Sequence, residues 1–450
     1  MKKLLLTAAT VLLAAMPALA NEPVTISVAR IKDLNIRLYG FLETDFIADT
    51  TQGFTEAQTN SLVPTRTVAG GGAANFAGVR HRTEMSVRDS RIGAVLSLPK
   101  TDSGLLAEGI LEVDFLGNQG PNTTPGATPG AQTEANFYNN PSLRIRHAYA
   151  NLTEGAWNAK LGQYWSLLGW QPYYFQDQAV VQAAPGQIFQ RFPQARVTRT
   201  DARGDWTLET AADVARPGDM NSGNPEAHAG LRLASTRYKG ACISQGGSAM
   251  VGLSAAVSAA VIPVATNGIG NPTGQAVAFD FLVPLIPSSD GKDRSNTLIW
   301  VGEFSSGSGV GGVEFTGLTF GVPGIAAATP GAGAALDAGI AGLNSSGNAE
   351  LIRERSFRTH LEYSLPGGQW AVSAGYAQIE GRNLDRFSFT PVLARAIAPK
   401  LQFAYASVFY DAFAWLRFAG EINQIRDTYN DAANRFAINN RYQLSTYLMF

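Results

Sequence analysis

Cysteine and histidine are almost absent from this sequence of 450 residues. Cys242 is the single cysteine, so the chain cannot form an intramolecular disulfide or a cysteine-based zinc or iron–sulfur cluster. The few histidines lie without another histidine, a cysteine or a paired acid at metal-ligand spacing: His81, His147, His228 and His360. We therefore expect neither a metal nor a cofactor.

Long apolar runs are missing as well, except at the start of the chain. Lys2 and Lys3 precede an apolar run over residues 4–15, and residues 18–20 have the small side chains of a signal-peptidase site. The run is short for a membrane-spanning helix, which is the alternative. The pattern predicts a signal peptide over 1–20, and no later apolar run is long enough for a spanning helix.

Excess charge of either sign is also missing, since the chain has 35 Lys+Arg and 36 Asp+Glu. The signal holds two of the basic residues and none of the acidic ones, so the mature chain has 33 basic and 36 acidic side chains, a net charge of −3. This balance argues against nucleic acid as a partner and against a polybasic membrane anchor.

What the sequence does contain is alternation of polar and apolar residues at every second position, from Leu34 to the end, with little helical periodicity. Residues 441–450 show it clearly. One face has Tyr442, Leu444, Leu448 and Phe450, and the other has Arg441, Gln443 and Ser445. Ten residues are enough for a tilted strand to cross a hydrocarbon layer of about 30 Å. An aromatic residue at the strand end is typical of the membrane interface of a barrel.

The first half of the chain follows the same pattern. Polar residues share one face of each strand and apolar residues the other over 36–45, 91–98, 105–115 and 143–152. In the last of these, Tyr149 falls on the apolar side with Leu143 and Ile145. The alternation changes phase near Asp89-Ser90, which predicts a bulge.

Long and short connectors alternate between these strands. The long ones are rich in Gly, Pro, Thr and Asn: 49–79, 117–141, 166–195, 216–227, 262–275, 305–351, 381–399 and 426–436. Their count gives about 16 strands and predicts an all-β fold, a transmembrane antiparallel β-barrel with long extracellular loops and short periplasmic turns. A soluble sandwich or a propeller is the alternative. However, no repeat of 40–50 residues is present, and neither fold explains the alternation of connector length.

These features divide the chain into a signal peptide over 1–20, a short periplasmic segment over 21–33 and an outer-membrane β-barrel over 34–450. Lipid of the bacterial outer membrane would then cover the apolar faces of the strands.

Charged residues on the polar faces would line the lumen. The basic ones are Arg37, Arg91, Arg144, Arg146, Lys160, Arg232 and Arg358, and the acidic ones are Glu43, Asp45, Glu108, Glu112, Asp114, Glu209 and Asp213. Arg144 and Arg146 point to the same side and have the geometry to hold a carboxylate or a phosphate. The alternative is that they pair with Glu112 and Asp114 across adjacent strands and stiffen the wall.

The connector over 166–195 is unusually aromatic. It follows Tyr164-Trp165 and contains Trp170, Phe189 and Phe192, among others. Such a loop is too apolar for solvent, so we expect it to fold into the barrel and narrow it, or to be buried at a subunit contact.

Catalytic motifs are weak. Residues 307–312 match the dinucleotide pattern G-x-G-x-x-G, but a strand or loop follows where a helix N-terminus is needed. No G-x-S-x-G elbow is present. A Ser–His site assembled from separate strands would leave no such motif, so an outer-membrane hydrolase stays an alternative.

Four stretches resemble the DcaP-like porins of Gram-negative bacteria. They are Ser90-Arg91-Ile92-Gly93, residues 108–117 (EGILEVDFLG), residues 143–149 (LRIRHAY) and residues 161–166 (LGQYWS). The terminal Phe450 looks like the signal that the barrel-assembly machinery reads in such proteins.

The resemblance implies a 16-stranded, trimeric diffusion channel for small hydrophilic solutes, with a preference for anions such as dicarboxylates. It also makes Arg91, Arg144 and Arg146 lumen arginines, with Glu112 and Asp114 as their pore-lining neighbours. The chain departs from the family in having only residues 21–33 before the first strand, where some members carry a coiled coil. We therefore expect a passive porin without enzyme activity. The hydrolase and a closed structural or adhesive barrel are the alternatives.

Overall fold

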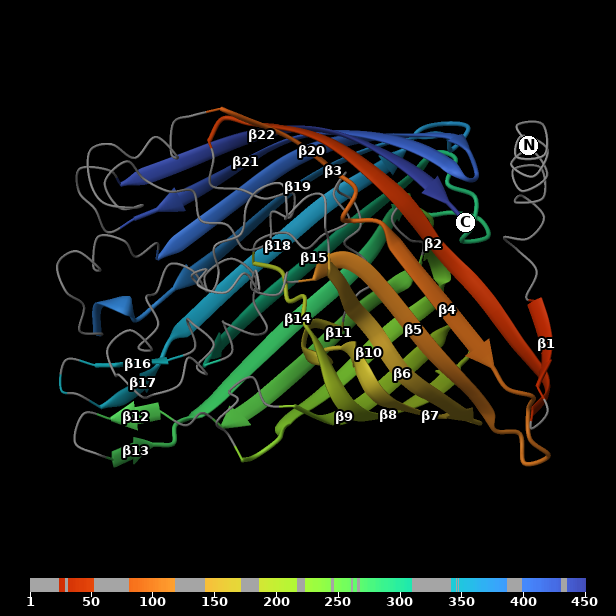
Figure 1. The fold of residues 1–450 in the computed structure, drawn as a ribbon, viewed down its shortest axis with the longest axis horizontal. Helices are drawn as coiled ribbons and strands as arrows, with labels where there is room; N and C mark the ends of the chain where they lie inside the picture. The colour runs from red at the N-terminus through yellow and green to blue at the C-terminus, as the bar shows by residue number, and fades with distance from the viewer. Residues whose placement is uncertain are drawn as a thin grey trace, which may run out of the picture.

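The computed structural model describes the parts of the chain that form the barrel and the ends of its loops (Figure 1). These parts are residues 24–28, 31–51, 81–117, 142–170, 186–216, 223–243, 247–259, 262–264, 268–309, 341–344, 346, 348–386, 399–429 and 435–450. The predicted signal peptide lies outside them.

One antiparallel sheet forms the wall of a barrel and closes on itself, which confirms the predicted fold class. Its strands are β2 (Ile31–Asp49), β3 (Arg82–Ser86), β4 (Arg91–Ser97), β5 (Leu106–Gly117), β6 (Ser142–Glu154), β7 (Trp157–Trp165), β8 (Arg191–Arg203), β9 (Trp206–Ala215), β10 (Glu226–Gly240), β11 (Gly247–Ala259), β14 (Thr273–Ile286), β15 (Thr297–Ser308), β18 (Arg353–Ser364), β19 (Trp370–Gly381), β20 (Lys400–Phe413), β21 (Leu416–Thr428) and β22 (Phe436–Met449). Because β3 and β4 both pair with β2 and together make one wall strand, the barrel has 16 strands.

Five shorter strands accompany the wall. The strand β1 (Val24–Val28) pairs with the start of β2, so β2 begins at Ile31 rather than at the predicted Leu34. In the long connectors, β12 (Ile262–Val264) pairs with β13 (Gly268–Gly270), and β16 (Ala341–Leu343) pairs with β17 (Ala349–Leu351). Two 3₁₀ turns, η2 (Leu168–Trp170) and η4 (Leu384–Arg386), follow β7 and β19.

The predicted bulge lies between β3 and β4. Asp45 of β2 pairs with Ser86, and Phe41 pairs with Arg91, so five steps on one chain match four on the other. The extra residue lies in the turn that contains Asp89, and it shifts the phase of the alternation as expected.

The two faces of the wall divide as the alternation predicts. On β22, Tyr442 and Leu444 are 54% and 65% exposed on the outside, while Arg441 and Gln443 are buried on the inside. Most of the seven tryptophans lie on the outside at or near the short turns, with 41–54% of their surface exposed: Trp157, Trp206, Trp300, Trp370 and Trp415. They form the aromatic girdle that marks one membrane interface of a transmembrane barrel.

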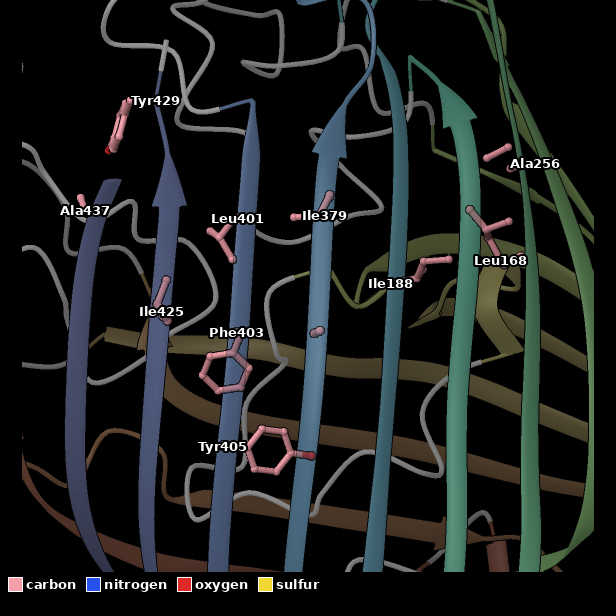
Figure 2. Close-up of a cluster of buried hydrophobic side chains, with 13 residues drawn as sticks. Leu168, Ile188, Ala256, Ile379, Leu401, Phe403, Tyr405, Ile425, Tyr429 and Ala437 are labelled. Atoms are coloured by element: carbon pink, nitrogen blue, oxygen red, sulfur yellow. The ribbon is translucent and has the colours of Figure 1, made fainter. Parts of the chain in front are cut away.

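The inner face is not polar throughout. On β20, Leu401, Phe403 and Tyr405 point inward and are buried, and Ile425 of β21 lies beside them (Figure 2). Leu168, from the turn after β7, belongs to the same cluster. Buried apolar side chains inside a barrel need other groups packed over them to exclude water. Leu168, from the segment after β7, is one of these groups.

The barrel closes where β2 meets β22. Asp49 and Arg441 are opposite each other, and the guanidinium donates from Nε at 2.9 Å and from Nη2 at 2.8 Å to the two carboxylate oxygens. Both side chains are fully buried. Next to them, Gln443 donates to Asp45 at 2.9 Å. The seam therefore depends on a buried bidentate ion pair as well as on backbone hydrogen bonds.

Replacing Arg441 with Met should weaken this seam, because Asp49 would stay buried without its charge partner. Breaking a buried pair costs about 3–5 kcal/mol. We expect the barrel to unfold at a lower temperature, measured as the temperature at which the compact band shifts on an SDS gel. Arg199→Met is the control, because Arg199 forms an exposed pair with Asp201. An unchanged transition in Arg441→Met would show that the pair does not hold the seam.

Candidate functional site

The predicted lumen charges of β4, β5 and β6 lie together on the inner face. Arg91 pairs in register with Asp114, and Asp114 with Arg144, so the strand pairing brings them side by side. We call the following set the wall cluster: Arg91, Glu112, Asp114, Arg144 and Arg146.

Asp114 is the centre of the wall cluster. Arg144 donates to its two oxygens, from Nε at 2.9 Å and from Nη2 at 2.6 Å. Arg146 adds a third bond from Nη1 at 3.2 Å. The Asp114 side chain is only 1% exposed, so the carboxylate that binds both arginines is itself buried in the wall.

Glu112 has a similar role one step along β5. Arg146 donates to it from Nε at 2.7 Å, and the Tyr39 hydroxyl donates at 3.0 Å. Arg91 lies 3.7 Å away and also stacks on Phe41, with 5.2 Å from the guanidinium carbon to the ring centre.

The strand β6 contains a bulge that the sequence did not reveal. Glu112 pairs with His147 and Val113 pairs with Ile145, so Arg146 is the extra residue. A bulge places two successive side chains on one face and reverses the alternation after it. The prediction that Tyr149 lies on the outer face with Ile145 was therefore wrong. Its ring packs 4.7 Å from that of Tyr164 and 6.1 Å from that of His147, within the wall-cluster region.

The ion-pair alternative is what the structure shows for these arginines. Arg146 is 1% exposed and bonded to both carboxylates, so it stiffens the wall. Arg144 is also paired, but 34% of its side chain is exposed. Only Arg144 of this pair presents charge to solvent.

Sequence reasoning missed one member of this region, Arg191. It begins β8, within the stretch assigned to a loop, and pairs in register with Trp165. Its guanidinium lies over the rings of Trp165 and Phe189, at 4.5 and 5.5 Å from the ring centres, and interacts electrostatically with the wall cluster. It forms no ion pair with any residue that the structure describes, and its Nη1 lacks a hydrogen-bond partner. The aromatic residues on both sides were the available signal.

Most of the other predicted lumen charges lie outside the wall cluster, although Glu43 lies close enough to Arg91 to interact with it electrostatically. Arg232 pairs with Glu209, Arg358 donates to Gln187, and Arg37 is exposed beside Tyr39. The remaining set is distributed along the inner face and includes Glu43, Asp45, Glu108, Lys160 and Asp213.

Asp213 lies in a buried network with a histidine. Arg196 donates to it at 3.1 Å, and His228 Nδ1 lies 2.7 Å away. His228 Nε2 faces Glu226 at 3.0 Å, so both ring nitrogens are held by carboxylates. That arrangement leaves no nitrogen for a serine hydroxyl, as a catalytic triad would need.

The two described ends of the aromatic loop after β7, 166–170 and 186–190, fold into the barrel as predicted, and the middle of the predicted loop lies outside the described residues. Gly169 N–H donates to Ser254 Oγ at 2.8 Å, and Ile188 N–H donates to Glu303 Oε1 at 2.8 Å. The acceptors belong to β11 and β15, on the inner wall. The predicted end of the loop at Ala195 was wrong, because residues 191–195 pair with β7 and belong to β8.

Trp170 fixes the first end of the loop. Its indole lies against Gly230 and Gly252 of the inner wall, where an added Cβ would come within 2.8 and 2.9 Å of the ring. Its Nε1 donates to the Leu253 carbonyl at 3.2 Å. The φ of Trp170 is 46°, a region that bulky residues rarely adopt. Two glycines on neighbouring strands thus form a slot that only a side chain from the loop fills.

Within the described part of the chain, no group of histidine, cysteine and acidic residues is arranged to hold a metal ion. The same part contains no helix with the length and apolar character to span a membrane.

Comparison with known proteins identifies the fold. The DcaP outer-membrane channel of Acinetobacter baumannii superposes with a TM-score of 0.64 at 14% identity, over 95% of this chain and 99% of that one. An anion-selective porin from Comamonas acidovorans gives 0.51 at 9% identity, over 93% and 100%. No family model matches the sequence, and no curated protein matches it. The chain therefore has the fold of outer-membrane porins, as the sequence resemblance implied.

Replacing Trp170 with Ala should release the loop from the wall. Loss of a buried tryptophan removes about 3–5 kcal/mol of packing, enough to populate an undocked loop. We expect a larger and noisier single-channel conductance in a planar bilayer. Trp206→Ala is the matched control, because Trp206 lies on the outside with 54% exposure. A conductance equal to that of the unmodified protein would mean that the loop does not narrow the barrel.

Proposed function

We propose that this protein is a passive outer-membrane channel for small hydrophilic solutes. The observation that carries the proposal is a closed barrel with the porin fold, whose apolar outer face and charged inner face suit a wall between lipid and water. The described ends of the loop after β7 support it, because they bond to Ser254 and Glu303 on the inner face and so reduce the space left for a solute there.

Conductance in a planar bilayer tests this proposal directly. A steady conductance at low voltage supports a channel. Absence of conductance from correctly folded barrels would contradict it and favour a closed structural barrel. Hydrolysis of lipid or peptide without conductance would favour the enzyme alternative.

We further propose a preference for anionic solutes, and Arg144 and Arg191 are the residues we assign to it. Arg144 is the exposed arginine of its ion pair. Arg191 is partly covered by the rings of Trp165 and Phe189, and it has no ion-pair partner among the described residues. Arginine matches carboxylate and phosphate geometry, and in a water-filled passage its charge raises the local concentration of anions. Arg146, although predicted for the same role, is buried between two carboxylates.

Replacing Arg144 and Arg191 together with Gln should shift the reversal potential toward cation selectivity under a salt gradient. The shift should be larger at about 0.1 M salt, where the Debye length is about 10 Å, than at 1 M, where it is about 3 Å. Arg199→Gln is the control, because Arg199 lies outside the lumen and 50% exposed. A reversal potential that does not move would remove both arginines from the selectivity role.

We propose that the chain also assembles as a homotrimer, through the outward face of β19 to β22. This face has an apolar depression of about 1040 Å³ whose floor includes Ala374, Ala406 and Gly420. Small side chains let walls approach closely in a membrane.

Ala406→Trp should fill the depression and lower the fraction of trimer in native mass spectrometry from detergent. Ala195→Trp is the control on the outward face of β8. An unchanged trimer fraction would place the contact elsewhere, and a monomeric unmodified protein would contradict the assembly itself.

A further inference from the structure

The outer face of the barrel has a polar groove where the strands meet the long connectors. The groove has a volume of about 1050 Å³ and crosses β11, β14, β15 and β18 to the turn η4. The strand pairing aligns its floor, since Val277 is opposite both Ala255 and Ser306, and Ser306 is opposite Arg355. The small side chains in this row of paired residues leave the space of the groove, and Arg355 at the end of the row closes one side of it.

Four arginines line this groove, two from β18, one that follows β19 directly and one from η4: Arg353, Arg355, Arg382 and Arg386. The side chains of the last three are 45%, 53% and 53% exposed. The carboxylate that faces them in the lining is Asp385, because Glu354 is 3% exposed on the opposite face of β18.

Two glutamates hold these arginines in place without saturating them. Glu380 accepts from Arg355 at 2.6 Å and from Arg382 at 2.9 Å, and Arg386 pairs with Glu350 at 3.2 Å. A guanidinium has five N–H donors, and each of these ion pairs uses one of them.

Arg353 has more unused N–H donors than the other three arginines. Its side chain is exposed, and it forms no ion pair with any part of the chain that the structure describes. The groove is therefore a set of fixed guanidinium groups with unused donors, an arrangement suited to an anion with several oxygens.

An apolar row lies directly beside the arginines, on the side toward the short turns. Its members are paired in one register across the same four strands and are 56%, 43%, 42% and 40% exposed: Leu253, Phe279, Phe304 and Phe357. Phe357 is two residues from Arg355 on β18, so the charged row and the apolar row share one face. A free phosphate would use only the first row, whereas a lipid would use both.

We infer that this groove binds the phosphorylated head group of an outer-leaflet glycolipid. Its phosphate oxygens accept hydrogen bonds from the arginines, and its acyl chains lie on the aromatic row below. The inference rests on the proposed outer-membrane setting, because the long connectors then face the leaflet in which such glycolipids occur.

The test uses the full barrel purified in detergent and native mass spectrometry with bisphosphorylated lipid A as the probe. We expect one tightly held lipid per chain, and weaker binding of the same lipid after its phosphates are removed. Arg353→Gln combined with Arg355→Gln should lower the affinity about tenfold to a hundredfold, because it removes hydrogen bonds to a charged group. Arg199→Gln combined with Arg203→Gln, at the opposite rim, should leave it unchanged.

Three results would overturn the inference. They are equal affinity in the double variant and the unmodified protein, equal binding of the dephosphorylated lipid, and full displacement by millimolar inorganic phosphate. Conductance of the same variants separates this site from the proposed channel. Failed lipid binding with normal conductance contradicts the groove alone, whereas absent conductance in the unmodified protein contradicts the channel.

Discussion

The need to pair every backbone amide and carbonyl governs this structure. Within a hydrocarbon layer an unpaired peptide group costs several kcal/mol, so a sheet that crosses it cannot keep free edges. The chain satisfies this by bringing β22 back to β2, and the side chains at that seam add the buried pair of Asp49 and Arg441. Closure then fixes which face of every strand points into the lumen and which points outward. The other features of the molecule depend on that division.

Closure also creates an interior that the strands alone do not fill. The chain uses the loop after β7 for this purpose, with Trp170 in the slot formed by Gly230 and Gly252, and with Ile188 bonded to Glu303. Apolar residues on the inner face, such as Phe403, are expected only where such a loop packs over them and excludes water. The inner face is therefore densely charged on β4 to β6 and apolar on part of β20, so its polarity differs from one part of the barrel to another.

Much of this was predictable from the sequence, because a period of two records which side of each strand is buried. The outer face of β22 and the bulge near Asp89 follow directly from that period. The bulge at Arg146 could not be predicted in this way, since the alternation along β6 does not show that β5 has one residue fewer at that point. Arg191 was assigned to a loop for another reason, because the aromatic and proline residues around it, Phe189, Phe192 and Pro193, are typical of the connector that precedes it. Strand register, which decides what Asp114 or Arg355 faces, arises from pairing across the sheet and not from local pattern.

The seam has a consequence for folding kinetics. Asp49 and Arg441 are separated by 392 positions, so hairpins built from neighbouring strands can form in any order while this contact waits for both ends of the sheet. Until then two long edges with unpaired amides stay open, and either can capture a strand of another molecule. A cell that makes this protein must keep those edges apart from foreign strands until the ring is complete.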